Sequence, residues 1–149
     1  MKQYEIKVKP VGLESQQNFK ENLDANHDAK KILFIEDNEE VTTLLQDFLK
    51  THFNADELKI FDEKTGHAGI ETAAAIKPDL IILDIVLDDI SGIEVYNRLE
   101  NHPSTSHTKF IIISGKAEYE PARAIFLQKP FKIDEFITIV KRLLKIKTD

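Results

Sequence analysis

The chain has 149 residues, no cysteine and a formal net charge of −6 at pH 7. This length suits one domain of ordinary size, and the lack of cysteine excludes disulfides and thiolate metal sites. The negative charge argues against nonspecific binding to DNA or to anionic membranes. No stretch has the apolar length of a signal peptide or a membrane span, so we expect a cytoplasmic protein that binds neither nucleic acid nor membrane.

From Lys31 onward, short apolar runs alternate with amphipathic stretches. Continuous apolar runs predict strands over residues 32–35, 58–61, 80–84, 110–113 and 124–128. Helical spacing of apolar residues predicts helices over about 41–49, 65–77, 91–102 and 133–144. Strands without polar alternation, separated by helices, indicate a parallel sheet covered on both faces. We therefore expect an α/β fold with a doubly wound, flavodoxin-like sheet of five parallel strands in the order 2-1-3-4-5.

The first 29 residues differ from the rest, and we expect them to be an extension to a domain that spans residues 30–149. Tyr4, Ile6 and Val8 alternate with polar residues, which is a weak strand signal. A linker or tail accounts for the same composition equally well. The sequence leaves both interpretations open.

Polar residues stand where four of the predicted strands end. Glu36 and Asp37 follow the first strand, Asp84 ends the third, Ser114 follows the fourth and Lys129 follows the fifth. Because the carboxyl ends of parallel strands share one edge of the sheet, these side chains should converge there. Neighbouring carboxylates repel one another unless a cation lies among them. Mg²⁺ suits such a site, since it takes one or two carboxylates and keeps waters and phosphate oxygens as further ligands.

This set of side chains favours phosphoryl transfer. An aspartate can attack phosphorus as a carboxylate nucleophile and become an aspartyl phosphate. The charge on the transferred oxygens then needs a metal ion, a hydroxyl donor and a cation, and Ser114 and Lys129 supply the last two. Each motif alone has an ordinary structural explanation, such as a helix cap for an acidic pair or a turn for Lys-Pro. Their joint placement at successive strand ends favours the functional interpretation.

Over about residues 30–147, the chain resembles the response-regulator receiver domains of two-component signalling. The resemblance rests on the acidic pair Glu36-Asp37, the segment 77–84 that leads into the phosphoacceptor, Gly92, Ser114, and Lys129-Pro130-Phe131. It implies that Asp84 accepts the phosphoryl group and that Lys129 pairs with Asp84 or with its phosphate. It also implies a cis peptide bond between Lys129 and Pro130.

The resemblance further implies a metal site and a switch. Mg²⁺ would be held by Asp37, Asp84 and the backbone carbonyl of Val86, while Glu36 would act partly through water. Ser114 would bond a phosphoryl oxygen and serve as a switch residue. Phe126 stands where the family has its switch aromatic, although a phenylalanine of the core would fit the same position.

Two features depart from the family pattern. Asp88, followed by Asp89, occupies the place of a usual proline, which indicates either tighter cation binding or a solvated turn. Only residues 115–123 separate Ser114 from the strand that begins at Ala124, and a parallel crossover normally needs a dozen residues or more. The family's fourth helix is therefore expected to be missing or reduced.

We expect a phosphoacceptor signalling module of a phosphorelay rather than an enzyme. Its partners would be a histidine kinase or phosphotransfer protein and an unknown downstream protein, with a homodimer as a further option. One alternative is a haloacid-dehalogenase-like phosphohydrolase, but such an enzyme needs a second acidic residue at the position of Val86. Another alternative is a pseudo-receiver that is never phosphorylated.

With the fourth helix reduced, the flank of the strand at 124–128 should need cover from residues 1–30 or from a second copy of the chain.

Overall fold

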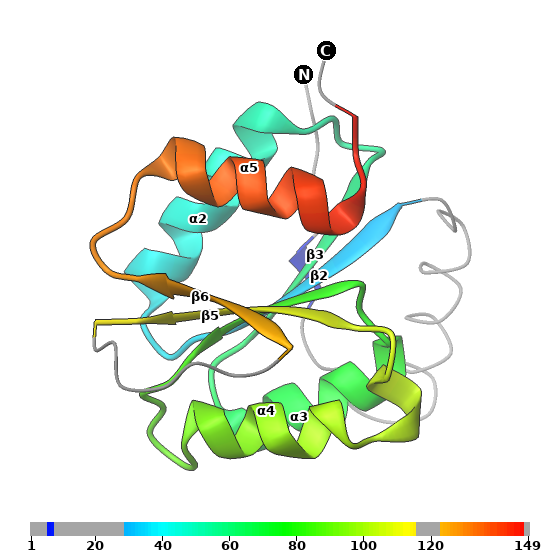
Figure 1. Ribbon diagram of the computed structural model, residues 1–149, viewed down its shortest axis with the longest axis vertical. Helices are drawn as coiled ribbons and strands as arrows, with labels where there is room; N and C mark the ends of the chain where they lie inside the picture. The colour runs from blue at the N-terminus through cyan, green and yellow to red at the C-terminus, as the bar shows by residue number, and fades with distance from the viewer. Residues whose placement is uncertain (1–5, 8–28, 116–122, 148–149) are drawn as a thin grey trace.

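A parallel six-stranded sheet lies between two layers of helices (Figure 1). This computed structural model describes residues 6–7, 29–115 and 123–147. Its strands are β1 (Ile6–Lys7), β2 (Lys30–Ile35), β3 (Leu58–Glu63), β4 (Leu80–Asp84), β5 (Lys109–Ser114) and β6 (Ala124–Gln128). Its helices are α2 (Glu39–His52), α3 (Gly66–Ile76), α4 (Gly92–Glu100), α5 (Ile133–Leu144) and the 3₁₀ helix η1 (Pro103–Thr105).

The strand order is β1-β3-β2-β4-β5-β6, and all the pairings are parallel. Without β1, this is the predicted order 2-1-3-4-5, so the fold class and the order of these five strands are confirmed. The prediction of five strands was incomplete, because β1 adds a sixth at the β3 edge.

Helices cover both faces of the sheet, and both faces are buried. Successive residues of a strand point to opposite faces and so join different core clusters. Ile32 and Phe34 of β2 join a core cluster with residues of α2 and α5, while Leu33 and Ile35 join a second cluster with residues of α3 and α4. This double burial explains why the strands are continuous apolar runs. None of the helices in the described part of the chain has the length and apolar character to cross a membrane.

The N-terminal strand lies beside β3, where Ile6 pairs with Ile60 and Lys7 with Phe61. Because β6 forms the opposite edge of the sheet, Ile6 and Lys7 do not cover the flank of β6. The other residues of the segment 1–30 expected to cover it are, apart from 29 and 30, outside the described residues. Tyr4 and Val8, which contributed to the alternation, lie outside the described residues.

Residues 115–123 connect β5 to β6. The helix that we expect to be missing or reduced in this connection falls on residues 116–122, which lie outside the described residues. In the described part of this connection, residues 115 and 123, there is no helix. The backbone N–H of Arg123 donates to the hydroxyl of Tyr96 (3.1 Å), and its guanidinium lies 3.7 Å from Glu100. Helix α4 thus fixes the start of β6.

The two apolar residues of β6 face opposite sides of the sheet. Ile125 packs against the cluster that includes α2 and α5, and Phe126 packs against the cluster that includes α3 and α4. Both side chains are partly buried, so the described core already supplies part of the cover that this strand needs.

Candidate functional site

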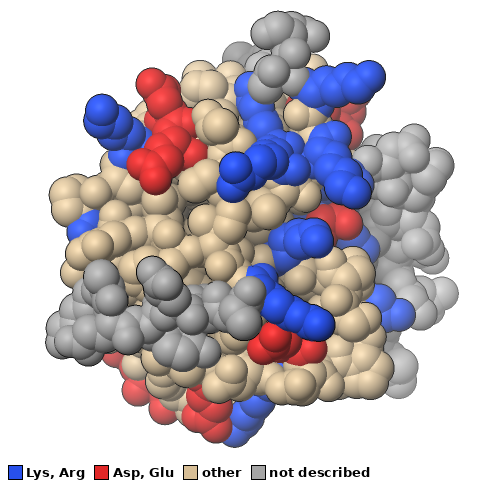
Figure 2. All heavy atoms as spheres, viewed as in Figure 1, with Lys and Arg blue, Asp and Glu red and all other residues tan. Residues whose placement is uncertain are grey.

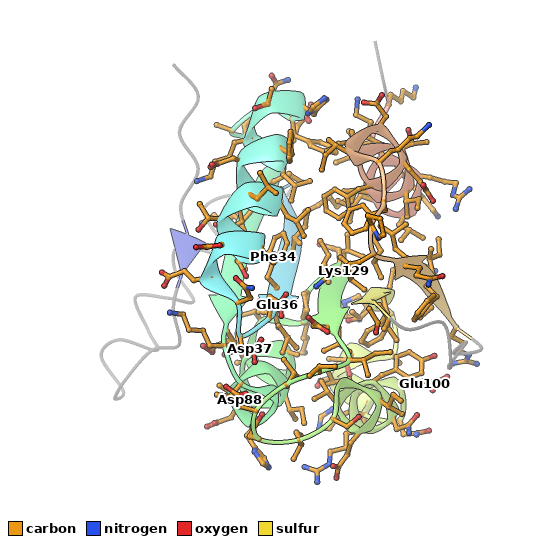
Figure 3. All side chains as sticks on the ribbon, turned by 90° about the vertical axis from the view of Figure 1, so that its left-hand side faces the viewer. Phe34, Glu36, Asp37, Asp88, Glu100 and Lys129 are labelled. Carbon is orange, nitrogen blue, oxygen red and sulfur yellow. The ribbon has the colours of Figure 1, made fainter. Side chains whose placement is uncertain are left out.

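The carboxyl edge of the sheet brings the predicted side chains together. Asp84 is the last residue of β4, Glu36 directly follows β2, Ser114 ends β5 and Lys129 directly follows β6. Figure 3 shows Glu36 and Lys129 near one another at this edge, with Asp37 next to Glu36 and the exposed Asp88 further away. The parallel register aligns these strand ends, and the strand order puts β4 between β2 and β5.

Lys129 bridges two of the carboxylates. Its Nζ lies 3.4 Å from Asp84 Oδ2 and 3.7 Å from Glu36 Oε1. The Asp84 and Glu36 side chains are only 12% and 7% exposed, so water screens these charges weakly. One ammonium group therefore faces two nearly buried carboxyl groups, with Asp37 adjacent in sequence.

The crowding of carboxyl groups at this edge changes the pKa of Glu36. Burial raises its pKa to about 8, assisted by hydrogen bonding to Asp84 and by the negative charges of Asp84 and Asp37, while Lys129 acts in the opposite direction. Its Oε2 atom is buried and has no hydrogen-bond partner. A buried oxygen without a partner costs free energy unless a proton, a water or a cation satisfies it.

Asp37 and Val86 lie at the outer rim of the site. Asp37 is partly exposed, and the Val86 residue is 67% exposed. The backbone N–H of Val86 donates to Asp84 Oδ1 (2.9 Å), so the two Asp84 oxygens have different partners, a backbone amide and the Lys129 ammonium.

The donor set fits a magnesium ion. Among the described residues, no group of three or more carboxylate and imidazole side chains is gathered closely enough to enclose a metal ion on its own. Mg²⁺ does not need such a cage, since it binds through one or two carboxylates and retains waters. Glu36, Asp37 and Asp84 offer oxygen ligands, and a cation would relieve both their repulsion and the unpartnered Glu36 oxygen.

Ser114 is buried at the end of β5, and its backbone carbonyl accepts a hydrogen bond from the Lys129 N–H (2.8 Å). The two residues are therefore fixed side by side. The peptide bond between Lys129 and Pro130 is cis. Phe126 lies three residues before Lys129, among the partly buried residues on the α3 and α4 side of the sheet.

Gly92, at the start of α4, permits a close backbone approach to Asp84. Its N–H donates to the carbonyl of Ile85 (2.8 Å), and a Cβ atom at this position would overlap the carbonyl oxygen of Asp84. A glycine is thus required here to keep the loop after β4 tight.

Asp89 has a structural role that the sequence did not reveal. Its carboxylate accepts hydrogen bonds from the backbone N–H groups of Gly66 and His67 (both 2.8 Å) at the start of α3. These bonds, that from His67 above all, hold the pKa of Asp89 well below its ordinary value. Asp89 therefore caps helix α3. The two roles expected for this acidic loop, tighter cation binding and a solvated turn, did not include a helix cap. No local signal links a loop aspartate to a helix 22 residues earlier.

Comparison with known proteins gives consistent results. The family model described as the response regulator receiver domain matches residues 32–141. The chain is 31% identical over 121 residues to the response regulator ArlR of Staphylococcus haemolyticus, which covers 76% of this chain and 52% of that protein. It is 23% identical over 150 residues to histidine kinase P4 of Formosa agariphila, covering 96% of this chain and 10% of the kinase. The chain thus spans about half of the regulator and a tenth of the kinase.

Solved structures share the fold. A response regulator from Chloroflexus aurantiacus aligns with a TM-score of 0.69 at 22% identity, covering 78% of this chain and 98% of that one. The receiver domain of the sensor histidine kinase PA1611 from Pseudomonas aeruginosa aligns with a TM-score of 0.68 at 19% identity, covering 78% of this chain and 98% of that one. That structure contains a magnesium ion coordinated in its active-site cleft.

Proposed function

The chain belongs to the response regulator receiver domain family, and from this membership we propose that it accepts a phosphoryl group on Asp84. The donor would be a histidine kinase or a phosphotransfer protein. The observation that carries the proposal is the ion pair of Asp84 with Lys129, which the nearly buried Glu36 shares. As a receiver domain, the chain is a phosphoacceptor module rather than an enzyme.

The transfer step is a displacement at phosphorus. A carboxylate oxygen of Asp84 forms a bond to the phosphorus of a phosphohistidine, the bond from phosphorus to the imidazole nitrogen breaks, and the released imidazole takes a proton from solvent. The Val86 N–H and the Lys129 ammonium hold the two Asp84 oxygens and so restrict the rotation of the carboxylate before attack.

Mg²⁺ would be held by Asp37, Asp84 and the backbone carbonyl of Val86, with Glu36 acting partly through water, and would neutralise charge on the transferred oxygens. Support comes from the oxygen donors at this edge and from the unpartnered oxygen of Glu36. The magnesium ion in the related PA1611 receiver domain adds support at the level of the fold.

Ser114 and Lys129 would read the phosphorylated state. The Ser114 hydroxyl would donate to a phosphoryl oxygen, and Lys129 would exchange its partner from the Asp84 carboxylate to the phosphate. Because Ser114 and Lys129 are joined through their backbones, a shift of one would move the other. Phe126 would follow as the switch aromatic, and output would pass to a downstream protein through contact.

The two other interpretations make different predictions. A dehalogenase-like phosphohydrolase would use an acid where this chain has Val86, and the family match is to receiver domains. A pseudo-receiver would keep the fold and take up no phosphate.

Labelling with acetyl phosphate and Mg²⁺, followed by intact-mass measurement, tests the proposal. The wild type should gain one phosphoryl group that is stable in acid and labile in base, whereas Asp84→Asn and Asp37→Ala should gain none. The exposed Asp56→Asn variant is the matched control and should label like the wild type. Equal labelling of Asp84→Asn would refute the assignment, and no labelling of the wild type would favour a pseudo-receiver.

A further inference from the structure

Asp89 joins the β4–α4 loop, residues 85–91, to the first turn of α3. One of its carboxylate oxygens accepts a hydrogen bond from the backbone N–H of Gly66 at 2.8 Å. The other accepts one from the backbone N–H of His67 at 2.8 Å and lies 2.7 Å from the Nδ1 atom of the same residue. Gly66 and His67 are the first two residues of α3. Hydrogen bonds to an ionised acceptor are stronger than those between neutral groups, so this is a firm connection.

Apolar packing reinforces the connection at the same place. Gly66 is buried, and a Cβ atom there would lie 2.6 Å from the side chain of Ile90 and 2.9 Å from that of Val95 in α4. The lack of a side chain at Gly66 therefore lets the start of α3 lie directly against the residue that follows Asp89. Because closely packed groups transmit displacements to one another, the loop and the start of α3 should move together.

The same loop carries Val86, whose backbone carbonyl is the ligand proposed for Mg²⁺. Val86 is 67% exposed, so its own side chain does little to fix the loop. Its neighbours Ile85 and Leu87 are partly buried against the core cluster that includes α3 and α4. Apolar contacts of this kind are not directional, so they restrain the position of the loop more than the orientation of its peptide groups.

Asp89 supplies the directional contacts that the loop otherwise lacks. Among the described residues, the hydrogen bonds that join residues 85–91 to an element other than β4 and α4 are those of Asp89. The remaining bonds are local, from the Val86 N–H to Asp84 and from the Gly92 N–H to the carbonyl of Ile85. The orientation of the peptide groups between Asp84 and Asp89 therefore depends on both ends of this segment being held.

We propose that Asp89 is a positioning residue of the metal site, which holds the Val86 carbonyl ready for Mg²⁺ by joining the loop to α3. The proposal rests on the magnesium site of the proposed function, and Asp89 itself does not bind the ion. Groups that orient a metal ligand raise the affinity of the site, since less ordering is needed when the ion binds. Coupling between two sites is reciprocal, so Mg²⁺ binding should in turn stabilise the first turn of α3.

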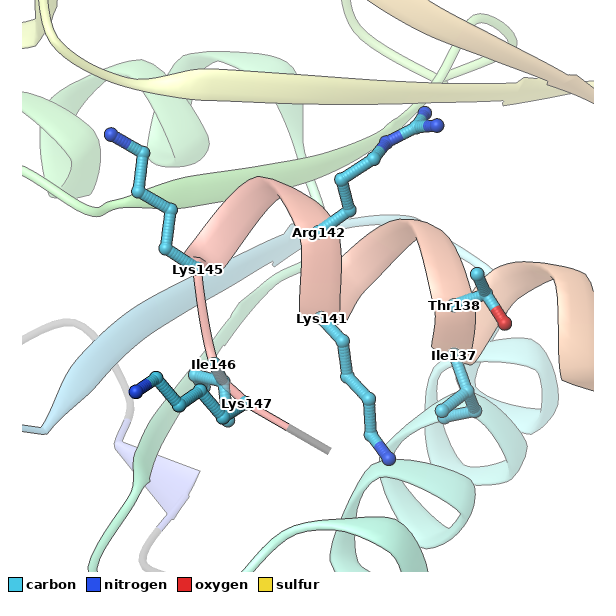
Figure 4. A pocket seen from close by; sticks show the side chains of 7 residues that line it. All are labelled: Ile137, Thr138, Lys141, Arg142, Lys145, Ile146 and Lys147. Atoms are coloured by element: carbon cyan, nitrogen blue, oxygen red, sulfur yellow. The ribbon is translucent and has the colours of Figure 1, made fainter. Parts of the chain in front are cut away.

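The charge of Asp89 is a competing reason for any effect on a cation, and two other charged positions separate the two explanations. Asp88 carries the same charge in the same loop and is exposed. Lys and Arg side chains gather over the C-terminal half of α5 (Figure 2). This half is remote from the carboxyl edge, where α5 begins after β6. A hollow of about 570 Å³ there is lined in part by Lys141, Arg142, Lys145 and Lys147 (Figure 4).

Titration of the full-length chain with Mg²⁺, followed by backbone-amide NMR at a temperature where every variant is folded, provides the test. Asp89→Ala should bind Mg²⁺ about tenfold more weakly than the wild type, as is usual when the partner of a metal ligand is removed. Asp89→Asn keeps one acceptor oxygen, so its affinity should lie between the two. Asp88→Ala and Lys147→Gln each remove one exposed charge and should bind Mg²⁺ like the wild type.

The wild type provides a second test that needs no substitution. The amide signals of Gly66 and His67 should shift at the same Mg²⁺ concentrations as that of Val86, and exchange of these two amides with solvent should slow several-fold. In Asp89→Ala the Val86 signal should still shift, at higher Mg²⁺ concentrations, while the signals of Gly66 and His67 should not respond.

Equal Mg²⁺ affinities of the wild type and Asp89→Ala would overturn the proposal. So would equal losses in Asp88→Ala and Asp89→Ala, which would assign the effect to charge, or Gly66 and His67 amides that do not respond to Mg²⁺ in the wild type. These outcomes would leave the proposed phosphorylation of Asp84 intact, because none of the measurements involves a phosphoryl group. A wild type that binds no Mg²⁺ would overturn both this inference and the magnesium site of the proposed function.

Discussion

Glu36 concentrates the electrostatics of the site in one side chain. Burial and the neighbouring carboxylates raise its pKa to about 8, so near neutral pH and without a cation it retains a proton. A proton and a metal ion are thus alternative ways to balance the same group of oxygens. The unpartnered Glu36 oxygen is the clearest indication of a cation site, and a cation bound there would displace the proton of Glu36.

Asp62, near the carboxyl end of β3, has a second carboxylate in an unfavourable environment. Its Oδ1 is buried without a hydrogen-bond partner, and burial raises its pKa above the ordinary value. Asp62→Asn removes the charge and keeps the shape. The variant should therefore be more stable than the wild type at pH 7, with a melting temperature higher by a few degrees.

The pH dependence of that gain has a definite sign. Because the pKa of Asp62 is raised in the folded state, the wild type loses stability as pH rises through that folded-state pKa. The advantage of Asp62→Asn should shrink as pH falls towards the ordinary aspartate range. Melting curves at several pH values measure this, with the exposed Asp56→Asn as control; an advantage that stays constant with pH would contradict the explanation.

Val86 should set the lifetime of the phosphoryl group. Its exposed side chain stands at the rim of the site and has no group to hold a water in line with the phosphorus. Val86→Asn would introduce such a group, so its aspartyl phosphate should decay several-fold faster than that of the wild type. Decay measured by intact mass after removal of the donor tests this, with Val86→Ala as control. Equal or slower decay in Val86→Asn would refute it.

At the scale of elements, Asp89 ties the loop after β4 to the start of α3. The first helical amides would otherwise lack partners, and Asp89 satisfies two of them. Asp89→Ala should therefore lower the melting temperature by several degrees. Thermal unfolding followed by circular dichroism measures this loss.

The neighbouring Asp88 offers a matched control for that experiment. It is exposed, carries the same charge and lies in the same loop. Asp88→Ala should melt close to the wild type. Equal destabilisation by both substitutions would show that the acidity of the loop matters and that the cap does not.

The elements differed in how far sequence could predict them. Strand β4 was predicted to its last residue, because a strand buried on both faces has a continuous apolar signature. The short strand β1 rests on backbone pairing with β3, and three alternating residues could not indicate at which edge it would lie. The convergence of Glu36, Asp84 and Lys129 followed from parallel topology, whereas the cap by Asp89 depends on tertiary contact.

At the scale of the whole molecule, β1 completes one edge of the sheet. Deleting residues 1–28 would remove this strand and leave the backbone of β3 open at that edge. Each lost backbone hydrogen bond contributes about 1 kcal/mol net, so the melting temperature should fall by roughly 2–6 °C. Phosphorylation of Asp84 should persist, because β3 separates β1 from the strands that carry the site.

A shorter deletion serves as the control for the extension. Removing residues 1–4 leaves Ile6 and Lys7 in place and should give a protein that melts like the full chain. If deletion of residues 1–28 also leaves the melting temperature unchanged, β1 contributes nothing to stability.

Mapping of the phosphorylated residue tests the central claim most directly. Borohydride reduces an aspartyl phosphate to homoserine, so protein treated with acetyl phosphate and Mg²⁺ can be reduced, digested and sequenced by mass spectrometry. We predict homoserine at position 84 alone, and none when either Mg²⁺ or the donor is omitted. Homoserine at Asp37 or Asp88 instead, or at no position, would contradict the assignment of Asp84 as the phosphoacceptor.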